Sequence, residues 1–553
     1  SFFVKIIFFI SYFFTKKKII KKFILHNKKI FKKNFYRNEN LILVEFNGWS
    51  LQHIIISYIS NVLAKKYSGT IHAYPGYVLN KYSLDWKSKL KFLLANLIPI
   101  KQFLIYSSFG TKKFFYPILK TDDTEIAKKI YERELVKIKN LNNIVNIKIN
   151  KVFVGDLIYD SYLKFYKCPT INFKDNKFKN FLFESIKSFI FWETYLKENK
   201  VKGIVFTHAV YSGAMLTRIA AYKYPGIELI SGNSNSVYNF NKTNFNPWLD
   251  FKKLKKDFLK LTTFEKKKGL EFSKKLIEQR IKGINNSDMN SAKKSPYNLG
   301  FKKRVIKDNS KIKVLIATHC FLDSPHIFGK FFFPDFLQWL NFLTEISKKT
   351  NYDWYIKSHP NFNPITYKLL KDFVKINKNF KLLPLNYGHK QILKEKIDFV
   401  LTVYGTIGWE YGFLGIPVIN ASRNNPHYNY KFNINPKSFK NYKKILLNLK
   451  NIKFKINKSE IYEFYLIAYV YHVVDWIFRD QKQLKKALKN FNKSFEKETY
   501  IKWINSFNID KHKQIIQSLN NFLESGDFKI KQKHCGYNFL LDIINKDKFI
   551  PKT

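Results

Sequence analysis

Two motifs in the C-terminal half of the chain carry residue types that bind phosphate groups. In the first, Lys357-Ser358-His359-Pro360, a histidine follows an apolar segment and the proline after it fixes the backbone. The second, Tyr404-Gly405-Thr406-Ile407-Gly408-Trp409-Glu410, follows about 46 residues later. An imidazole donates a hydrogen bond or a proton to phosphate oxygens, and free backbone N–H groups at the start of a helix attract anions. Together the motifs predict a site for a phosphate-bearing ligand.

The residues of these motifs have separate expected roles. We expect His359 to donate to a phosphate oxygen and to ease the departure of a nucleotide leaving group. Gly405 and Gly408 flank the hydroxyl of Thr406 and predict a phosphate cradle. Glu410 is expected to accept hydrogen bonds from ribose hydroxyls, although an acid in a first helical turn is also favourable for capping alone. The turn matches neither the Walker A loop nor the dinucleotide-binding fingerprint.

Both motifs follow predicted strands. Apolar runs of strand length begin at four places, KIKVLIATH at Lys311, DWYIKSHP at Asp353, KIDFVLTVYG at Lys396 and IPVINAS at Ile416. Strands that alternate with helices predict a parallel sheet, whose ligands bind beyond the carboxyl ends of the strands. The two motifs are therefore expected to meet at one edge of this sheet.

The first half of the chain shows the same alternation. Strands are predicted at LILVEFNG from Leu41, around Thr70 to Ala73, at KQFLIYSSFG from Lys101, at VKGIVFTHA from Val201 and at GIELISG from Gly226. The predicted fold class is α/β, with two Rossmann-like, doubly wound domains, a basic N-terminal helix and a helical C-terminal extension.

Composition predicts the boundaries. The stretch from 256 to 310 is rich in Lys, Asn and Ser and contains INNSDMNSAKKSPYN, which is typical of a linker. The predicted segments are an N-terminal basic and apolar helical segment at 1–38, a first Rossmann-like domain at 39–255, a linker region at 256–310, a second Rossmann-like domain at 311–457 and a helical C-terminal extension at 458–553.

From 311 to about 425 the chain resembles the bacterial capsule polysaccharide glycosyltransferases of GT-B architecture, the group with capsule Kdo-transferases and bacterial sialyltransferases. The HP motif of that group corresponds to His359-Pro360. Its Ser/Thr-Gly turn into an acid-bearing helix corresponds to Thr406-Ile407-Gly408-Trp409-Glu410, and its Gly-x-Pro-Val strand to Gly415-Ile416-Pro417-Val418. Trp409-Glu410-Tyr411 departs from the usual Glu-Ala, and the first domain is similar in architecture only.

The resemblance implies transfer of a sugar from a nucleotide-sugar donor, with a CMP-linked donor expected, to a capsule or surface glycan acceptor. It assigns acceptor binding to 39–255 and the sugar nucleotide to 311–457. It makes His359 a catalytic residue and implies that the donor is bound by Lys357, Pro360, Gly405, Thr406, Gly408 and Glu410.

An inverting transfer also needs a base for the acceptor hydroxyl, which we expect from the first domain. Asp156 in Gly155-Asp156 loosely matches a short acidic motif of sialyltransferase-like families, although an isolated loop acid also serves as a cap or turn residue. Further candidates near predicted strand ends are Asp160, Glu45 and His208. In the second domain Asp323 and His326 follow the first strand and are expected to bind a ligand or to order their loop.

No cofactor or metal is expected. Cys168, Cys320 and Cys535 are far apart and form no pattern typical of zinc ligands. No DxD motif stands at a predicted strand end, and GT-B enzymes generally neutralise the leaving phosphate with helix dipoles and basic side chains.

The chain is strongly basic, with 98 Lys and Arg against 41 Asp and Glu and a formal net charge of +57. Such a charge is typical of proteins that bind nucleic acid or anionic lipid, but the Lys- and Asn-rich composition of an AT-rich genome explains it equally well. The apolar run Ser1–Phe14 is shorter than the roughly 20 residues that span a bilayer. Because lysines follow that run, it predicts either a helix on an anionic inner-leaflet surface or an ordinary buried first helix. We expect a cytoplasmic protein, peripheral on the inner face of the plasma membrane.

Other functions stay open. A CDP-glycerol or polyol-phosphate transferase of teichoic-acid type shares the architecture and a similar His-Pro. A sugar-nucleotide 2-epimerase needs acids and histidines around the anomeric carbon that the sequence does not group together. A non-catalytic polyanion-binding protein rests on charge alone, since no nucleic-acid-binding signature is present. The expected partners are a nucleotide-sugar, a glycan or lipid-linked glycan acceptor and anionic lipid, with no specific nucleic acid.

Overall fold

The computed structural model describes residues 18–31, 39–76, 86–98, 102–245, 251–284, 295–329, 331–359, 363–479 and 498–536. They form two compact units. Unit 1 comprises the described parts of Ser1–Ser161, Asn172–Pro247 and Val473–Asn538, and unit 2 comprises those of Tyr162–Ile171 and Trp248–His472. Each unit contains a mainly parallel sheet with helices on its faces, so the predicted α/β class with two Rossmann-like units is confirmed.

Unit 2 contains a five-stranded sheet in the order β11-β10-β9-β12-β13, with every neighbouring pair parallel. The strands are β9 (Lys313–Ala317), β10 (Asp353–Lys357), β11 (Phe380–Leu382), β12 (Phe399–Thr402) and β13 (Val418–Asn420). The chain passes from β9 to β10 and β11 on one side and then to β12 and β13 on the other side. The strand order therefore reverses between β9 and β12, which is where an open parallel sheet binds ligands.

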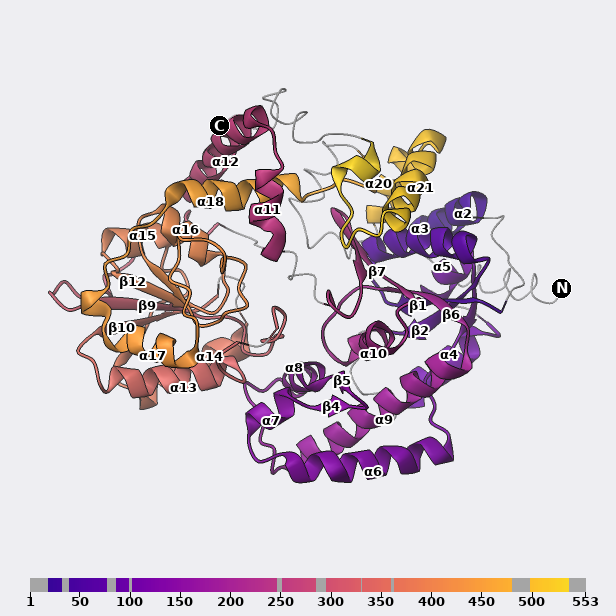
Figure 1. Ribbon diagram of the computed structural model, residues 1–553, viewed down its shortest axis with the longest axis horizontal. Helices are drawn as coiled ribbons and strands as arrows, with labels where there is room; N and C mark the ends of the chain where they lie inside the picture. The colour runs from indigo at the N-terminus through magenta and orange to yellow at the C-terminus, as the bar shows by residue number, and fades with distance from the viewer. Residues whose placement is uncertain are drawn as a thin grey trace. The chain divides into compact units, whose positions relative to one another are not determined.

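Helices cover both faces of this sheet (Figure 1). One face packs against α13 (Phe336–Ser347), α14 (Pro364–Ile376) and α17 (Phe439–Leu447), around the fully buried Trp339 and Trp354. The other face packs against α15 (His389–Lys394) and α16 (Ile407–Phe413). Local signals start two of these helices, since Asp335 caps α13, and Asn363 caps α14 ahead of Pro364 at its first position.

Unit 1 contains a six-stranded sheet in the order β3-β2-β1-β6-β7-β8, in which only the β7–β8 pair is antiparallel. The strands are β1 (Leu41–Phe46), β2 (Thr70–Pro75), β3 (Thr111–Phe114), β6 (Val201–Phe206), β7 (Glu228–Asn233) and β8 (Ser236–Phe240). A hairpin of β4 (Lys148–Ile149) and β5 (Val152–Phe153) lies outside the sheet. Here the order reverses between β1 and β6. Glu45 is the last residue but one of β1, and His208 follows the end of β6.

The helices of unit 1 come from three parts of the chain. They are α2 (Lys18–Ile30), α3 (Ser50–Tyr67), α4 (Trp86–Ala95), α5 (Gln102–Ser108), α6 (Thr121–Lys137), α7 (Leu141–Val145), α8 (Gly155–Tyr166), α9 (Asn176–Glu198), α10 (Met215–Lys223), α20 (Glu498–Ser506) and α21 (Ile509–Glu524). Helix α8 begins in unit 1, and its residues from Tyr162 onward belong to unit 2. The strand predicted from Lys101 is wrong, because those residues form α5. Four consecutive side chains, Phe103 to Tyr106, are buried there, and a short helix that is apolar on all sides has the same sequence pattern as a buried strand.

The helix α2 packs inside unit 1. Phe23 and Ile24 are buried in its core, and the Phe23 ring stacks on Tyr500 of α20 with centroids 4.3 Å apart. Residues 18–30 therefore form a helix that packs on the core of unit 1. Residues 1–17, which include the apolar run, lie outside the described residues. No helix in the described part of the chain is long and apolar enough to cross a membrane.

The segment from 248 to 310, most of which the sequence assigns to a linker, belongs to unit 2 and contains α11 (Leu254–Leu259) and α12 (Thr263–Lys282). The predicted C-terminal extension is divided between the units. Its first part, α18 (Lys458–Tyr465) and a π-helix (Leu466–Tyr471), belongs to unit 2. From Val473 the chain belongs to unit 1, where Trp476 is fully buried and donates to the carbonyl of Asn233 (2.7 Å).

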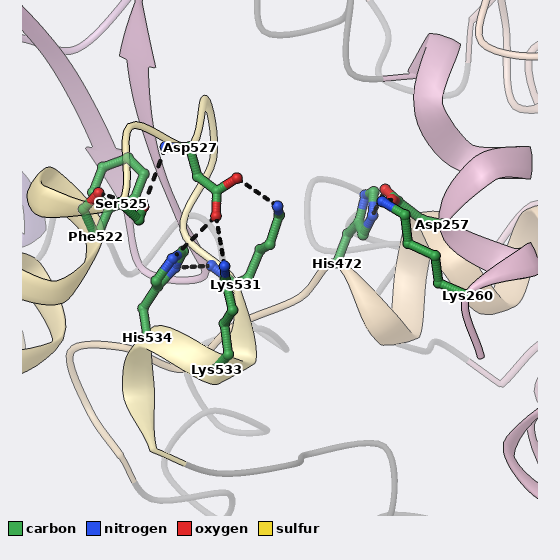
Figure 2. Close-up of polar contacts among 9 residues, drawn as sticks. All are labelled: Asp257, Lys260, His472, Phe522, Ser525, Asp527, Lys531, Lys533 and His534. Atoms are coloured by element: carbon green, nitrogen blue, oxygen red, sulfur yellow. Dashed lines mark hydrogen bonds and ion pairs between the residues drawn. The ribbon is translucent and has the colours of Figure 1, made fainter. Parts of the chain in front are cut away.

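Each unit has an aspartate that is paired with basic side chains (Figure 2). In unit 2 the Nε2 of His472 lies 3.0 Å from Asp257 Oδ2, and Lys260 donates to the same carboxylate (3.2 Å). Burial raises the pKa of Asp257, but these two partners outweigh it and the net pKa lies below 3.8. In unit 1 Asp527 is surrounded by Lys531 (2.6 Å), Lys533 (3.2 Å) and His534 (3.2 Å).

Candidate functional site

The reversal point of unit 2 brings a histidine that follows β9 against the end of β12. His319 Nε2 lies 3.2 Å from Thr402 Oγ1, and the same hydroxyl accepts a hydrogen bond from the N–H of Gly405 (3.3 Å). Phe336 stacks on the His319 ring at 5.0 Å, and Tyr404 lies at 4.5 Å. Burial lowers the pKa of His319 to about 3, so the imidazole is neutral at physiological pH. Sequence reasoning placed His319 after a strand but gave it no role.

His359 lies next to this histidine. It is exposed at the end of β10, and its charge contributes to the lowered pKa of His319 while Asp323 acts in the opposite direction. The backbone before it is fixed to β9, because the N–H and the hydroxyl of Thr318 both donate to the carbonyl of Lys357 (3.1 Å each). Pro360 of the same motif lies outside the described residues. Two imidazoles therefore share the edge formed by the carboxyl ends of β9 and β10.

The side chain of Lys357 is buried on the α15–α16 face of the sheet. Its Nζ donates to the carbonyl of Leu385 (3.1 Å), and burial lowers its pKa to about 8. Because the ammonium group lies inside the unit while His359 is exposed, these two residues of one motif point to different surroundings. The positive charge of Lys357 also lowers the pKa of His389, which burial brings to about 4.

The glycine turn presents only its first half at the edge. Gly405 is half-buried and Thr406 is exposed, whereas Gly408 is buried. A Cβ at Gly408 would come within 2.6 Å of both His427 and Asn433, so this glycine permits close packing inside the unit. The N–H groups of the first helical turn, from Gly408 onward, donate to the carbonyls of Gly405 and Thr406. Of the predicted cradle, Gly405 and Thr406 border the edge.

Glu410 is buried and held by three hydrogen bonds. Its carboxylate accepts from Arg280 of α12 (2.8 Å), Tyr297 (2.8 Å) and Thr406 (3.0 Å). Burial raises its pKa, but the opposing effects of Arg280 and His389 are larger in sum and the net pKa lies below 4.5. This charged group is thus occupied by partners from its own unit, and it anchors the helix that carries Thr406.

Arg280 was missed by sequence reasoning because α12 lies in the predicted linker. A signal for this helix was present. Thr262 and Glu265 form a capping box, in which the Thr262 hydroxyl accepts from the N–H of Glu265 (3.2 Å) and the Glu265 carboxylate accepts from the N–H of Thr262 (2.8 Å). Gly283, with a φ of +98°, ends the helix in the left-handed conformation.

Two predicted residues of unit 1 meet at its own reversal point. The carboxylate of Glu45 accepts hydrogen bonds from the N–H and the hydroxyl of Thr207, with the Thr207 Oγ1 at 2.7 and 2.8 Å from its two oxygens. The Nδ1 of His208 lies 3.0 Å from the same hydroxyl. Burial raises the pKa of Glu45 to about 7. A carboxyl group with that pKa is poised to exchange protons near neutral pH.

Asp156, the first candidate for the base, is placed differently. It is buried, and both its oxygens accept from the Arg218 guanidinium, at 3.1 and 3.0 Å. The guanidinium also donates to the carbonyl of Phe153 (2.9 Å) and lies over the ring of Phe245 at 4.3 Å. This bidentate pair ties the start of α8 to α10. Asp160 is buried on the same helix.

The two remaining candidates lie in the loop after β9. Asp323 is exposed, and its carboxylate is 3.6 Å from Lys164 Nζ. His326 is buried, with its ring 6.1 Å from that of Phe331, and its carbonyl accepts from the N–H of Gly329 (2.7 Å). Asp323 thus faces solvent near the two edge histidines, while His326 orders the loop. Within the described ranges no group of three or more His, Cys, Asp or Glu is placed to hold a metal ion.

Comparisons with known proteins give distant structural similarities. No family model and no curated protein matches the chain. Among solved structures, a "KpsC, beta Kdo 2,4 transferase" of Thermosulfurimonas dismutans is similar at 11% identity over 48% of this chain and 79% of that one, with a TM-score of 0.30. A UDP-GlcNAc 2-epimerase of Neisseria meningitidis bound to UDP-GlcNAc is similar at 13% identity, over 85% and 100% of the chains, with a TM-score of 0.22. A glycosyltransferase of Rickettsia africae is similar at 9% identity, over 85% and 99%, with a TM-score of 0.20. These values establish no family for the chain.

Proposed function

We propose that the chain is a glycosyltransferase that moves a sugar from a nucleotide-sugar donor to a capsule or surface glycan. The observation that carries this proposal is the set of groups at the reversal point of unit 2. A neutral His319, an exposed His359 and the Gly405-Thr406 turn share the edge where a parallel sheet binds its ligands. His359 and the main-chain N–H groups at this edge are suited to donate hydrogen bonds to a phosphate, and the exposed Asp323 lies near the two histidines.

The reaction would be a direct displacement. The acceptor oxygen bonds to the anomeric carbon, the bond from that carbon to the phosphate oxygen breaks, and its electron pair leaves with the nucleotide. His359 would donate to the phosphate oxygen as negative charge develops on it. The main-chain N–H groups of Thr406 and Ile407, for which the described residues provide no hydrogen-bond acceptor, would hold the same phosphate. In the transition state, negative charge develops on the leaving phosphate, and these hydrogen-bond donors would stabilise that charge.

The resemblance of the two motifs to capsule glycosyltransferases favours a CMP-linked donor, an inverting outcome and a GT-B arrangement without a catalytic metal. The buried pairing of Glu410 with Arg280 and Tyr297 favours an anchoring role for this acid over contact with the donor ribose. The bidentate pairing of Asp156 with Arg218 similarly favours Glu45 and His208 over Asp156 as the source of the base.

Thermal unfolding of the purified chain with CMP, CDP, UDP, GDP and ADP tests the proposal, because a ligand that binds only the folded state raises the Tm. We expect one nucleotide to raise the Tm of the native chain and to lose that effect in His359→Ala. The matched control is His72→Ala, a half-buried histidine inside β2 of unit 1, which should keep the full shift. No response to any nucleotide, with strong stabilisation by DNA or heparin, would favour a polyanion-binding protein instead.

A further inference from the structure

A continuous hydrogen-bonded chain crosses the reversal point of unit 1. The Thr207 hydroxyl touches both oxygens of the Glu45 carboxylate, at 2.7 and 2.8 Å, and the Nδ1 of His208, at 3.0 Å. A hydroxyl has one proton to donate and lone pairs to accept with. With a charged Glu45, the Thr207 hydroxyl donates to the carboxylate and accepts from the Nδ1–H of His208. The Nε2 of His208 is then the unprotonated nitrogen.

The inner end of this chain is enclosed. Glu45 is 3% exposed, and a Cβ at Gly76 would lie 1.7 Å from its Cγ, so only glycine fits at the end of β2. Burial raises the pKa of Glu45 to about 7. His208 at the outer end is half-buried. The hydrogen bonds that the described residues make to the Glu45 carboxylate therefore lead through Thr207 to His208.

The histidine is held in a defined orientation. The ring of Trp49 meets the His208 ring edge-on, with centroids 5.1 Å apart and an interplanar angle of 86°. The loop that follows contains Tyr211 at φ 63° and ψ 177°, a conformation that costs a non-glycine residue energy, and the Ser161 hydroxyl accepts from the N–H of Ser212 (2.6 Å) beside it. Strain of this kind persists where the surrounding structure imposes it, and it is concentrated at functional sites.

Among the described residues, no cation pairs with the carboxylate of Glu45. Tyr106 of α5 donates to the main-chain carbonyl of Glu45 (2.8 Å), and burial raises the pKa of this phenol well above 10. His53 of α3 lies behind Asn47, whose carbonyl contacts its Nε2 (2.8 Å), and burial lowers the pKa of His53 to about 4. Both groups are neutral near pH 7, so the group that responds to the Glu45 charge through Thr207 is His208.

We propose that Glu45, Thr207 and His208 form a hydrogen-bonded triad in which His208 Nε2 accepts the proton of a ligand hydroxyl. Glu45, acting through Thr207, orients the imidazole and stabilises its positive charge. The step breaks the O–H bond of the ligand, leaves its electron pair on the oxygen and forms an N–H bond at Nε2, while the carboxylate balances the imidazolium charge. In identifying the ligand as the sugar hydroxyl of the acceptor, this inference rests on the proposed function. His208 is then the catalytic base, and Glu45 and Thr207 are positioning residues.

The coupling of His208 to Glu45 is measured by treating the full chain with diethyl pyrocarbonate at a series of pH values. This reagent modifies only the neutral imidazole, and peptide mass spectrometry then gives the extent of His208 modification at each pH. Loss of the carboxylate or the bridging hydroxyl, in Glu45→Gln or Thr207→Val, should lower the midpoint for His208 by about one pH unit. Thr207→Ser keeps the hydroxyl and should restore the native midpoint. His72 in the same digests, on β2, is the internal control and should not shift. A His208 midpoint that stays within about 0.2 pH units of the native value in both variants would overturn the proposed triad.

Catalysis is tested separately, with the sugar nucleotide whose nucleotide raises the Tm of the native chain. Release of free nucleotide should fall about 100-fold or more in His208→Ala, while the nucleotide-induced rise in Tm is retained. Unchanged release with a retained Tm rise would overturn the role of His208 and leave the donor site intact. Loss of all nucleotide response in the native chain would count against the proposed function, while the carbethoxylation result would still decide the coupling.

Discussion

The acids of this protein show how a single residue type takes different roles in different surroundings. Glu410 is buried beside the Arg280 guanidinium and has a pKa below 4.5. Glu45 is buried with no cation beside it in the described part of the chain, and its pKa is about 7. Asp156 is held by two bonds from Arg218. Because the ionised form of Glu410 and the protonated form of Glu45 are the ones that the fold stabilises, these two glutamates respond to pH in opposite directions.

Glu45→Gln tests the environment of that carboxyl. The pKa of Glu45 is raised in the folded state, from 4.5 to about 7, so the native chain loses stability as the pH rises through that window, by roughly 3 kcal/mol when complete. The glutamine variant has no charge to bury. The difference in Tm, variant minus native, should therefore increase from pH 5 to pH 8. Glu39→Gln, at an exposed acid paired with Lys200, should give a difference that stays flat over this range.

Arg280→Met tests the anchor of α16. It leaves the Glu410 carboxylate buried without its counter-charge and should lower the free energy of unfolding by about 3–5 kcal/mol, measured by urea denaturation. Adding Glu410→Gln removes that charge, so the double variant should be less destabilised than the sum of the two single variants. Arg304→Met breaks an exposed pair with Asp308 and should change stability by less than about 1 kcal/mol. Equal effects of the two arginine substitutions would contradict the anchor.

At the scale of elements, the apolar runs were a reliable guide to the central strands. β1, β6, β9, β10 and β12 are buried in the sheets, and parallel strands of this kind are apolar on both faces. The short strands β3, β8 and β11 and the β4–β5 hairpin were not predicted, because two to five residues give little periodicity to recognise. The seven-residue α5 was predicted as a strand for the same reason.

The contacts between site residues were harder to predict from the sequence than the site residues themselves. Glu45 and His208 were both candidates, but their meeting through Thr207 depends on the pairing of β1 with β6, which lie about 160 residues apart in the sequence. The Arg280–Glu410 pair depends in the same way on where α12 packs. Sequence spacing indicates which residues follow strands, whereas contacts between them depend on the strand order.

Gly408→Ala tests the packing of α16 against the loop that carries His427. A methyl group there would meet His427 and Asn433 at 2.6 Å, and such overpacking should lower the free energy of unfolding by about 1–3 kcal/mol. Gly226→Ala is the control, because nothing lies within 4 Å of its Cβ position and its φ is not in the left-handed region. A Tm of Gly408→Ala as high as that of the control would show that the helix is not fixed at this point.

The two units do not follow one another along the chain, because residues from Val473 onward belong to unit 1 again. After His472 it returns to unit 1, where Trp476, Trp503, Ile515, Leu519 and Phe522 join the core with α2 and α3. These side chains lie in the segment that the sequence predicts as a helical C-terminal extension. Unit 1 therefore needs residues from both ends of the sequence.

A fragment that ends at His472 tests this organisation. It lacks the C-terminal part of the unit 1 core, and the exposed apolar surface should leave unit 1 unfolded. We expect limited proteolysis to degrade residues from β1 to β8 of the fragment rapidly, while the same residues resist in the full chain. Equal resistance in both would mean that residues 473–536 are dispensable for unit 1.

The most direct test of the donor site is hydrogen–deuterium exchange of the full chain, with and without the nucleotide that raises its Tm. A donor site at the reversal point of the unit 2 sheet predicts slower exchange in peptides that cover 318–324, 357–359 and 402–410, and loss of that protection in His359→Ala. Protection confined to unit 1, or no protection in these three segments at saturating nucleotide, would contradict it.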